Sequence, residues 1–118
     1  MATHLETGKT GEDLAVAWLR DNQYRILFRN WRYSHYEIDI IALKENILCF
    51  IEVKCLNSTE RGYPEDKVTR KKFRNIQFAA DHYLHLHPGY KWIQYHILSI
   101  TLYKDREPEY FLLEDIYL

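Results

Sequence analysis

Two short apolar segments that carry acidic residues constrain the fold of this chain more than any other part of it. They are Glu37 to Ile41 and Phe50 to Lys54, and they lie in the apolar runs Tyr36 to Leu43 and Ile47 to Lys54, which flank Lys44-Glu45-Asn46. Apolar runs on either side of a short polar segment predict an antiparallel β-hairpin. The acidic residues must therefore be accommodated within the strands of this hairpin.

The length of the turn decides which residues of the hairpin face one another. If the turn is Glu45-Asn46, Lys44 pairs with Ile47. Because side chains alternate between the two faces of a strand, the same register gives two more pairs on a single face. These pairs are Asp39 with Glu52 and Glu37 with Lys54. A three-residue loop would break this pairing.

The predicted register places the carboxylates of Asp39 and Glu52 opposite each other within apolar strands. Directly opposed side chains have Cβ atoms about 4.5–5.5 Å apart, and like charges there destabilise a sheet. A divalent cation offsets this repulsion, and Mg²⁺ is typically held by one or two carboxylates with waters and phosphates. Lys54, on the same face, could neutralise charge or orient and activate a water.

A second interpretation of the same pattern is that Glu52 and Lys54 form only the solvated face of a half-buried sheet. Leu48 and Phe50 share the face of Glu52, and Ile41 shares that of Asp39. A mostly apolar stripe that ends in charges favours a partly covered cleft over open solvent. Spacing alone leaves both interpretations open.

The remaining elements follow from periodicity. A first helix is predicted over Gly11 to Asp21, with Thr10 as its N-cap and acidic residues in its first turn. A second is predicted over about Glu65 to His85, begun by Pro64 and ended by His87-Pro88-Gly89. Its buried face should contain Val68, Ile76, Ala79, Ala80 and Tyr83. Further strands are predicted over Tyr24 to Tyr33 and Trp92 to Tyr103, and Tyr110 to Tyr117 is predicted to be a last strand or a short terminal element.

This order of elements predicts one α/β (α+β) domain over residues 1–118, with its core from about residue 11 to 114. Lys and Arg total 16 and Asp and Glu 17, so the chain is not a uniformly basic nucleic-acid coat protein, although a local basic patch is compatible with this balance. No secretory signal and no membrane-spanning run is recognisable, so we expect a cytoplasmic protein with reduced thiols. Cys49 shares a face with Ile47 and Ile51 and is expected in the core.

A basic segment and six His complete the candidate groups. The basic residues are Arg61, Lys67, Arg70, Lys71, Lys72 and Arg74. Of these, Lys67, Arg70, Lys71 and Arg74 recur at spacings of three and four, which predicts a stripe opposite the buried face of the second helix. The stripe could hold phosphates or be an ordinary solvated face. The His are expected at the surface or at helix ends, because a structural zinc site usually needs thiolates or a closed set of four ligands.

Several ordered motifs together resemble a known protein family. Asp39, followed after twelve residues by Glu52-Val53-Lys54, resembles the core of the PD-(D/E)XK nuclease superfamily. From about Gly11 to Leu113 the chain resembles, more specifically, the bacterial UPF0102 (YraN-like) family, distantly related to archaeal Holliday junction resolvases. The other pieces that carry the resemblance are Gly11-Glu12, Arg29-Asn30-Trp31-Arg32, Glu37 to Ile41, Gly62-Tyr63-Pro64, Val68, Lys72 and Ala79 to Leu84.

The resemblance implies a restriction-endonuclease-like fold, with a central mixed sheet flanked by helices and the site on the acidic hairpin. It implies that Asp39 and Glu52 bind Mg²⁺ or Mn²⁺, with Glu12 and the Val53 carbonyl as further ligands and Glu37 in support. It also implies that Lys54 positions or activates the attacking water.

The chain departs from the family pattern at two notable positions. The family usually has Gly where this chain has Tyr36, and an Asp in the late strand where this chain has His96. The superfamily's Pro before the first Asp is Ile38 here, at a position that serves backbone shape.

The function expected from the resemblance is metal-dependent hydrolysis of phosphodiester bonds in DNA, including branched or repair intermediates. The alternative is a nucleic-acid-binding or interaction module that keeps the nuclease architecture without significant catalysis. The sequence does not distinguish DNA from RNA as the substrate, because no residue reports on the 2′-hydroxyl. It does not distinguish branched from linear substrates either. Symmetric cutting of a junction would require a homodimer, and no residue identifies the dimer surface.

Overall fold

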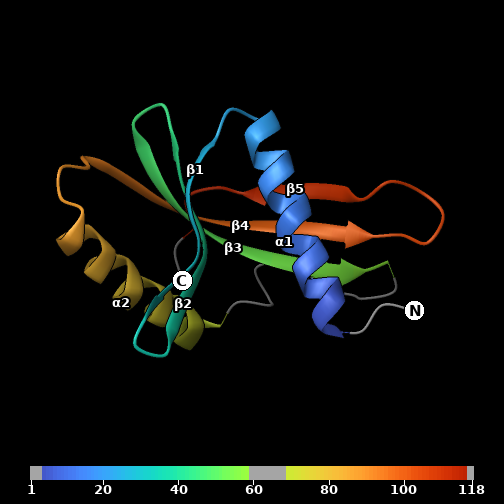
Figure 1. Ribbon diagram of the computed structural model, residues 1–118, viewed down its shortest axis with the longest axis horizontal. Coiled ribbons are helices and arrows are strands. Elements are labelled where there is room, and N and C mark those ends of the chain that lie inside the picture. Colours follow the sequence, from blue (N-terminus) through green and yellow to red (C-terminus); the bar gives the residue numbers. More distant parts are fainter. Residues whose placement is uncertain (1–3, 59–68, 117–118) are drawn as a thin grey trace.

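A five-stranded mixed sheet forms the centre of the fold (Figure 1). The structure is a computed structural model that describes residues 4–58 and 69–116. Its elements are α1 (His4–Asp21), β1 (Arg25–Tyr33), β2 (Tyr36–Lys44), β3 (Ile47–Asn57), α2 (Arg70–Leu86), β4 (Trp92–Leu102) and β5 (Glu109–Leu113). The strands lie in the order β1-β2-β3-β4-β5. The mixed sheet and its two helices confirm the predicted fold class.

The parallel pair in the middle of the sheet explains the position of α2. β1, β2 and β3 are antiparallel neighbours, β4 runs parallel to β3, and β5 is antiparallel to β4. Parallel neighbours need a long crossover connection, usually a helix. The connection from β3 to β4 contains α2, which packs mainly on β2, whereas α1 packs mainly on β3.

The β2–β3 hairpin has the predicted turn and register. Lys44 pairs with Ile47 across the two strands. Glu45 and Asn46 have φ angles of 50° and 67°. Positive φ at both central residues is typical of the type I′ turn, whose twist matches that of the flanking strands.

The predicted pairing of Glu37 with Lys54 is wrong. The ladder between β2 and β3 ends at Ile40 and Ile51. Beyond this point β3 continues alongside β4, while β2 stays paired with β1. Glu37 therefore lies opposite Arg32 of β1, and the two side chains form an ion pair at 3.4 Å.

Each face of the sheet has its own apolar core. On one face Ile40, Cys49, Ile51 and Leu98 pack with residues of α1 such as Ala15 and Leu19. On the other, Ile41, Leu48 and Phe50 pack with the α2 residues Ile76, Ala79, Ala80 and Tyr83. Cys49 is buried, which confirms its predicted place in the core. None of the helices in the described part of the chain is long and apolar enough to cross a membrane.

The start of the first helix differs from the prediction. α1 begins at His4, so Thr10 lies inside the helix and does not cap it. Gly11, the predicted first residue of the helix, lies where α1 approaches β3 closely. A Cβ at this position would overlap the Sγ atom of Cys55 on β3. Because Gly11 has no side chain, α1 lies close against β3 at this point. The next residue of the helix is Glu12.

The second helix also begins later than predicted. Thr69 has extended backbone angles, and its hydroxyl accepts a hydrogen bond from the Lys72 amide at 3.1 Å, so it caps a helix that starts at Arg70. The predicted start at Glu65, with Pro64 and Val68, lies outside the described residues. The helix ends as predicted, where the His87 amide donates to the Tyr83 carbonyl. The last strand stops at Leu113, short of the predicted Tyr117.

Candidate active site

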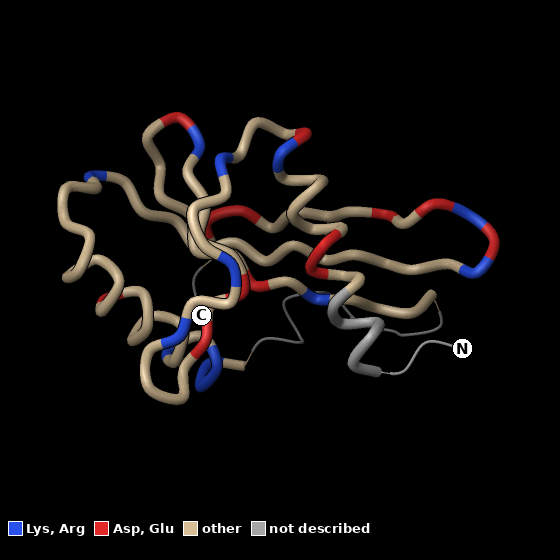
Figure 2. The backbone as a smooth tube through the Cα atoms, viewed as in Figure 1, with Lys and Arg blue, Asp and Glu red and all other residues tan. Residues whose placement is uncertain are grey.

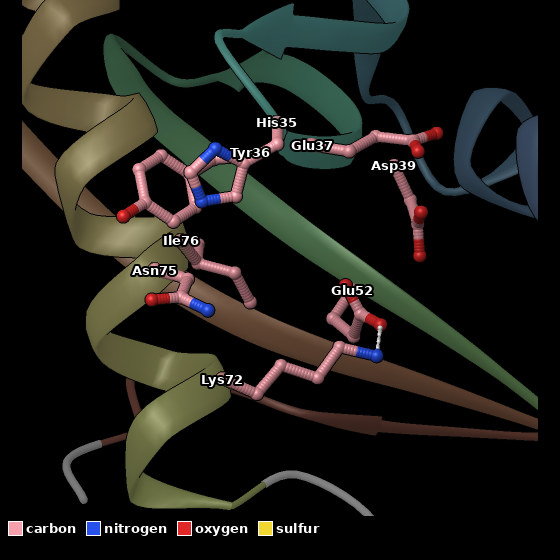
Figure 3. Close-up of a pocket in the computed structure, with 8 residues that line it drawn as sticks. All are labelled: His35, Tyr36, Glu37, Asp39, Glu52, Lys72, Asn75 and Ile76. Carbon is pink, nitrogen blue, oxygen red and sulfur yellow. Dashed lines mark ion pairs between the residues drawn. The ribbon is translucent and has the colours of Figure 1, made fainter.

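A pocket of about 240 Å³ lies where β2 and β3 separate beneath the first turns of α2 (Figure 3). Three carboxylates, those of Glu37, Asp39 and Glu52, share its lining with the ammonium group of Lys72. His35, Tyr36, Asn75 and Ile76 complete the lining. The pocket therefore combines acidic, basic and aromatic groups from two strands and one helix.

Asp39 stands at the point where the β2–β3 ladder ends. Its Oδ2 atom accepts a hydrogen bond from the Val53 amide at 2.8 Å, which replaces the next rung of the ladder. Burial and the neighbouring charge of Glu52 raise the pKa of Asp39 from 3.8 to about 8. The Val53 hydrogen bond and the charge of Lys72 only partly oppose this rise. A carboxyl group in such surroundings is short of positive charge.

Glu52 is buried, with 7% of its side chain exposed, and it contacts two lysines. Its Oε1 atom lies 2.6 Å from the Nζ atom of Lys72 and 3.5 Å from that of Lys54. A carboxylate this deep in the protein needs such partners, because an unpaired buried charge is strongly destabilising.

The two lysines are not equivalent. Burial and a hydrogen bond from Lys72 lower the pKa of Lys54 below its ordinary value of 10.5. Burial also opposes the charge on Lys72, but its hydrogen bonds to Glu52 and Lys54 outweigh burial and raise its pKa. Lys72 is thus the more firmly charged of the two, whereas Lys54 gives up its proton more readily.

A fourth acidic residue, Glu12, reaches the site from α1. Ligand oxygens of Glu12, Glu37 and Asp39 all lie within 4.8 Å of one another. Asn30 of β1 donates a hydrogen bond from Nδ2 to Glu12 Oε2 at 3.1 Å. Asn30 has a φ of 52°, a left-handed conformation that Asn tolerates better than most residues. Glu12 is therefore held in place both by the close approach of α1 at Gly11 and by Asn30.

These carboxylates fit a hard divalent cation. Mg²⁺ and Mn²⁺ prefer carboxylate oxygens, and Glu12, Glu37 and Asp39 present three at mutual distances short enough for one ion. Burial and the neighbouring Glu52 raise the pKa of Asp39, and a bound cation would favour its charged form. Figure 2 shows acidic residues gathered near the middle of the molecule and basic residues at the start of α2.

The predicted site residues that lie together in the structure are Glu12, Asp39, Glu52 and Lys54. Glu37, predicted only to support the site, is itself a member of the acidic cluster. The observed contribution of Val53 is its amide, which binds Asp39, while its side chain packs in the core on the α1 face. The predicted carbonyl ligand is not tested by these contacts. It stays a prediction.

The predicted basic stripe is only partly described. Arg70, Lys71 and Arg74 are exposed on α2, while Arg61 and Lys67 lie outside the described residues. Lys72 does not share the exposed surface of its neighbours but points into the site. The signal was present in the sequence, because Lys72, Ile76, Ala79 and Tyr83 follow one another at helical spacings of three and four.

His96, which stands where the family usually has an Asp, packs inside the fold. His96 is 2% exposed and lies edge-on to the ring of Tyr24. Its Nδ1 atom accepts a hydrogen bond from the Asp115 amide at 3.0 Å. Burial lowers its pKa below the ordinary value of 6.5, so the imidazole is neutral at pH 7. His96 is not among the residues that line the pocket.

Comparisons with known proteins identify the family of this chain. The model of the uncharacterised protein family UPF0102 matches residues 11–103. A UPF0102 protein of Bacteroides thetaiotaomicron is 46% identical over 86 residues, which cover 73% of this chain and 71% of the relative. A UPF0102 protein of Flavobacterium psychrophilum is 40% identical over 107 residues, covering 91% of this chain and 88% of the relative. The matched span includes Glu12, Asp39, Glu52 and Lys72, and the chain belongs to the uncharacterised protein family UPF0102.

Proposed function

We propose that this protein is a metal-dependent endonuclease that hydrolyses phosphodiester bonds in DNA, in the cytoplasm. The observation that carries the proposal is a partly buried pocket lined by Asp39 and Glu52, with Glu12 close to Asp39 and Lys54 paired with Glu52. Burying like charges together destabilises a fold, so an arrangement of this kind is rarely found without a functional reason. The resemblance of the acidic hairpin to PD-(D/E)XK nucleases supports the same chemistry.

Each residue would have a distinct task. Asp39 and Glu52 would hold Mg²⁺ or Mn²⁺, with Glu12 and Glu37 as further ligands. When bound, such a cation polarises the phosphate and lowers the pKa of a water. Lys54 would orient the attacking water and take its proton, in keeping with its lowered pKa. Lys72 would keep Glu52 in place through their 2.6 Å ion pair.

Cleavage of labelled DNA tests the proposal. Linear duplex, single strand, flap, four-way junction and RNA would each be incubated with Mg²⁺, Mn²⁺ or EDTA. Glu52→Gln, purified in parallel, controls for contaminating nucleases. We expect metal-dependent cleavage that Glu52→Gln and Asp39→Asn lose while they stay folded. Lys54→Ala should keep metal binding and lose at least about tenfold in rate, as expected for loss of a proton-transfer group. Equal cleavage by Glu52→Gln and the parent would refute the site.

One observation favours a second candidate, a nucleic-acid-binding module without catalysis. The ion pairs of Glu52 with Lys72 and Lys54 neutralise this carboxylate without any cation. Titration with Mn²⁺ separates the two candidates, since a binding module has no need of a cation held by carboxylates.

Symmetric cutting of a junction would in addition require two copies of the chain, which light scattering with and without junction DNA would detect.

A further inference from the structure

Two aromatic rings stand at the edge of the candidate active site, the half-buried Tyr36 and the exposed Phe78. Tyr36, on β2, lines the pocket beside the carboxylates and lies next to α2 (Figure 3). Its ring is nearly parallel to that of Phe78 on α2, with 6.0 Å between ring centroids and 13° between ring planes. Phe78 is 59% exposed. Because stacked rings cover each other's inner faces, the ring that the pair offers to solvent is that of Phe78, with Tyr36 behind it.

This aromatic pair is the boundary between two cavities. On one side is the pocket with Asp39 and Glu52. On the other is a cavity of about 260 Å³, to which Phe78 contributes together with Arg74, Gln77, Asp81 and Tyr95. A chain of nucleotides with a phosphate at the carboxylates would therefore pass directly over Tyr36 and Phe78.

The charges along this path fit a phosphodiester backbone. Arg74 lies one helical turn before Phe78 on α2 and lines the second cavity. Arg70 and Lys71 continue the basic surface toward the start of the helix, and both are exposed. Asp81 is the one acidic member of the second cavity's lining. An aromatic face flanked by basic groups is the pattern with which proteins hold unpaired strands.

We propose that Tyr36 and Phe78 form a stacking platform for an unpaired nucleobase next to the phosphate bound at the carboxylates. The inference rests on the proposed function and narrows its substrate to strands with unpaired bases beside the cleavage point. In a duplex the faces of the bases are covered by their neighbours, so only an unpaired base can offer its face to the rings.

Binding without metal tests the platform separately from catalysis. Fluorescence anisotropy in EDTA would compare a labelled 20-nucleotide oligothymidylate with a blunt duplex of the same length. Tyr36→Leu and Phe78→Leu keep an apolar side chain and remove the aromatic face. Each should weaken single-strand binding about fivefold or more, the lower end of the effect of one base–aromatic stack. Duplex binding should change by less than about twofold, since backbone contacts hold the duplex.

Two matched variants control for general effects. Trp92 is 65% exposed and lies at the start of β4, beside Ile47 at the far end of the hairpin from Glu52. Trp92→Leu should bind the single strand as the parent does. Tyr36→Phe keeps the ring and should also bind normally. Thermal unfolding of every variant establishes that it is folded.

The possible failures are distinguishable. Unchanged single-strand binding by Tyr36→Leu and Phe78→Leu, or an equal loss for duplex and single strand, would overturn the platform, even if the parent cleaves DNA. Selective loss of single-strand binding would support the platform in EDTA whether or not the parent cleaves. Absence of metal-dependent cleavage in the substrate panel would then count against the nuclease alone.

Discussion

Replacement of Asp39 by Asn should make the metal-free protein more stable, and increasingly so as pH rises. Asn keeps an oxygen that can accept the Val53 hydrogen bond but carries no charge beside Glu52. In the wild-type protein the pKa of Asp39 is raised from 3.8 to about 8. Between these values the unfolded chain is ionised while the folded chain must take up a proton, so folding becomes less favourable as pH rises.

The size of the effect follows from the pKa. From pH 5 to pH 7 lie two pH units, each equivalent to about 1.4 kcal/mol, which sets a ceiling of about 3 kcal/mol. The interaction of Asp39 with Glu52 and the access of solvent to the pocket both reduce this ceiling. We therefore expect the advantage of Asp39→Asn to grow by about 1–3 kcal/mol between pH 5 and pH 7.

Urea unfolding followed by tryptophan fluorescence in EDTA measures this difference. A change of this size shifts the unfolding midpoint by about 1 M urea. Asp13→Asn is a matched control, since Asp13 is an exposed carboxylate in a 2.7 Å ion pair with Arg29. It should change stability by less than about 1 kcal/mol at both pH values. Excess Mg²⁺ should stabilise the wild type and leave Asp39→Asn unchanged.

Two results would refute this reasoning. The first is an advantage of Asp39→Asn that is the same at pH 5 and pH 7, which would mean that Asp39 titrates normally in the folded protein. The second is a variant less stable than the wild type at pH 7, which would mean that the carboxyl group makes contacts worth more than its repulsion from Glu52.

Three further variants probe the surroundings of the site. Gly11→Ala should lower stability by about 1–3 kcal/mol in urea unfolding, because the added methyl group overlaps Cys55, and combination with Cys55→Ala should recover the loss. Asn30→Gly keeps the left-handed backbone but releases Glu12, so it should weaken Mn²⁺ binding about tenfold in calorimetry; unchanged binding would contradict this role. His96→Asn should flatten the fall in stability below pH 6.5, since burial lowers the pKa of His96 and only the unfolded wild-type chain takes up that proton; an unchanged slope in urea unfolding at pH 5.5–7.5 would argue against it.

The hairpin was the part of the site that the sequence could specify. Its register follows from local chemistry, because a two-residue turn with both φ angles positive leaves a single pairing of the flanking strands. The closeness of the Asp39 and Glu52 side chains could therefore be predicted without a tertiary structure, although the ladder itself ends one pair earlier, at Ile40 and Ile51. The failure of the Glu37–Lys54 pair could not, because it depends on β3 leaving β2 to continue beside β4.

Residues that reach the site from the helices were harder to place. By charge, Lys72 belongs with the basic residues beside it in the sequence. Its spacing of four residues to Ile76, however, aligns it with the buried face of α2. The start of α1 was misplaced because Thr10 and Gly11 carry local signals of a helix start, while the close packing on Cys55 that requires a Gly is a long-range contact. Local signals cannot distinguish these two uses of the same residue.

The convergence of four separate elements on the pocket has a consequence for the newly made protein. Glu12 comes from α1, Asp39 from β2, Glu52 from β3 and Lys72 from α2, so no short fragment of the chain contains a complete site. During synthesis the acidic hairpin leaves the ribosome before Lys72 is available to neutralise Glu52. A nascent chain would thus lack the proposed nuclease activity, which would appear only when the whole domain has folded.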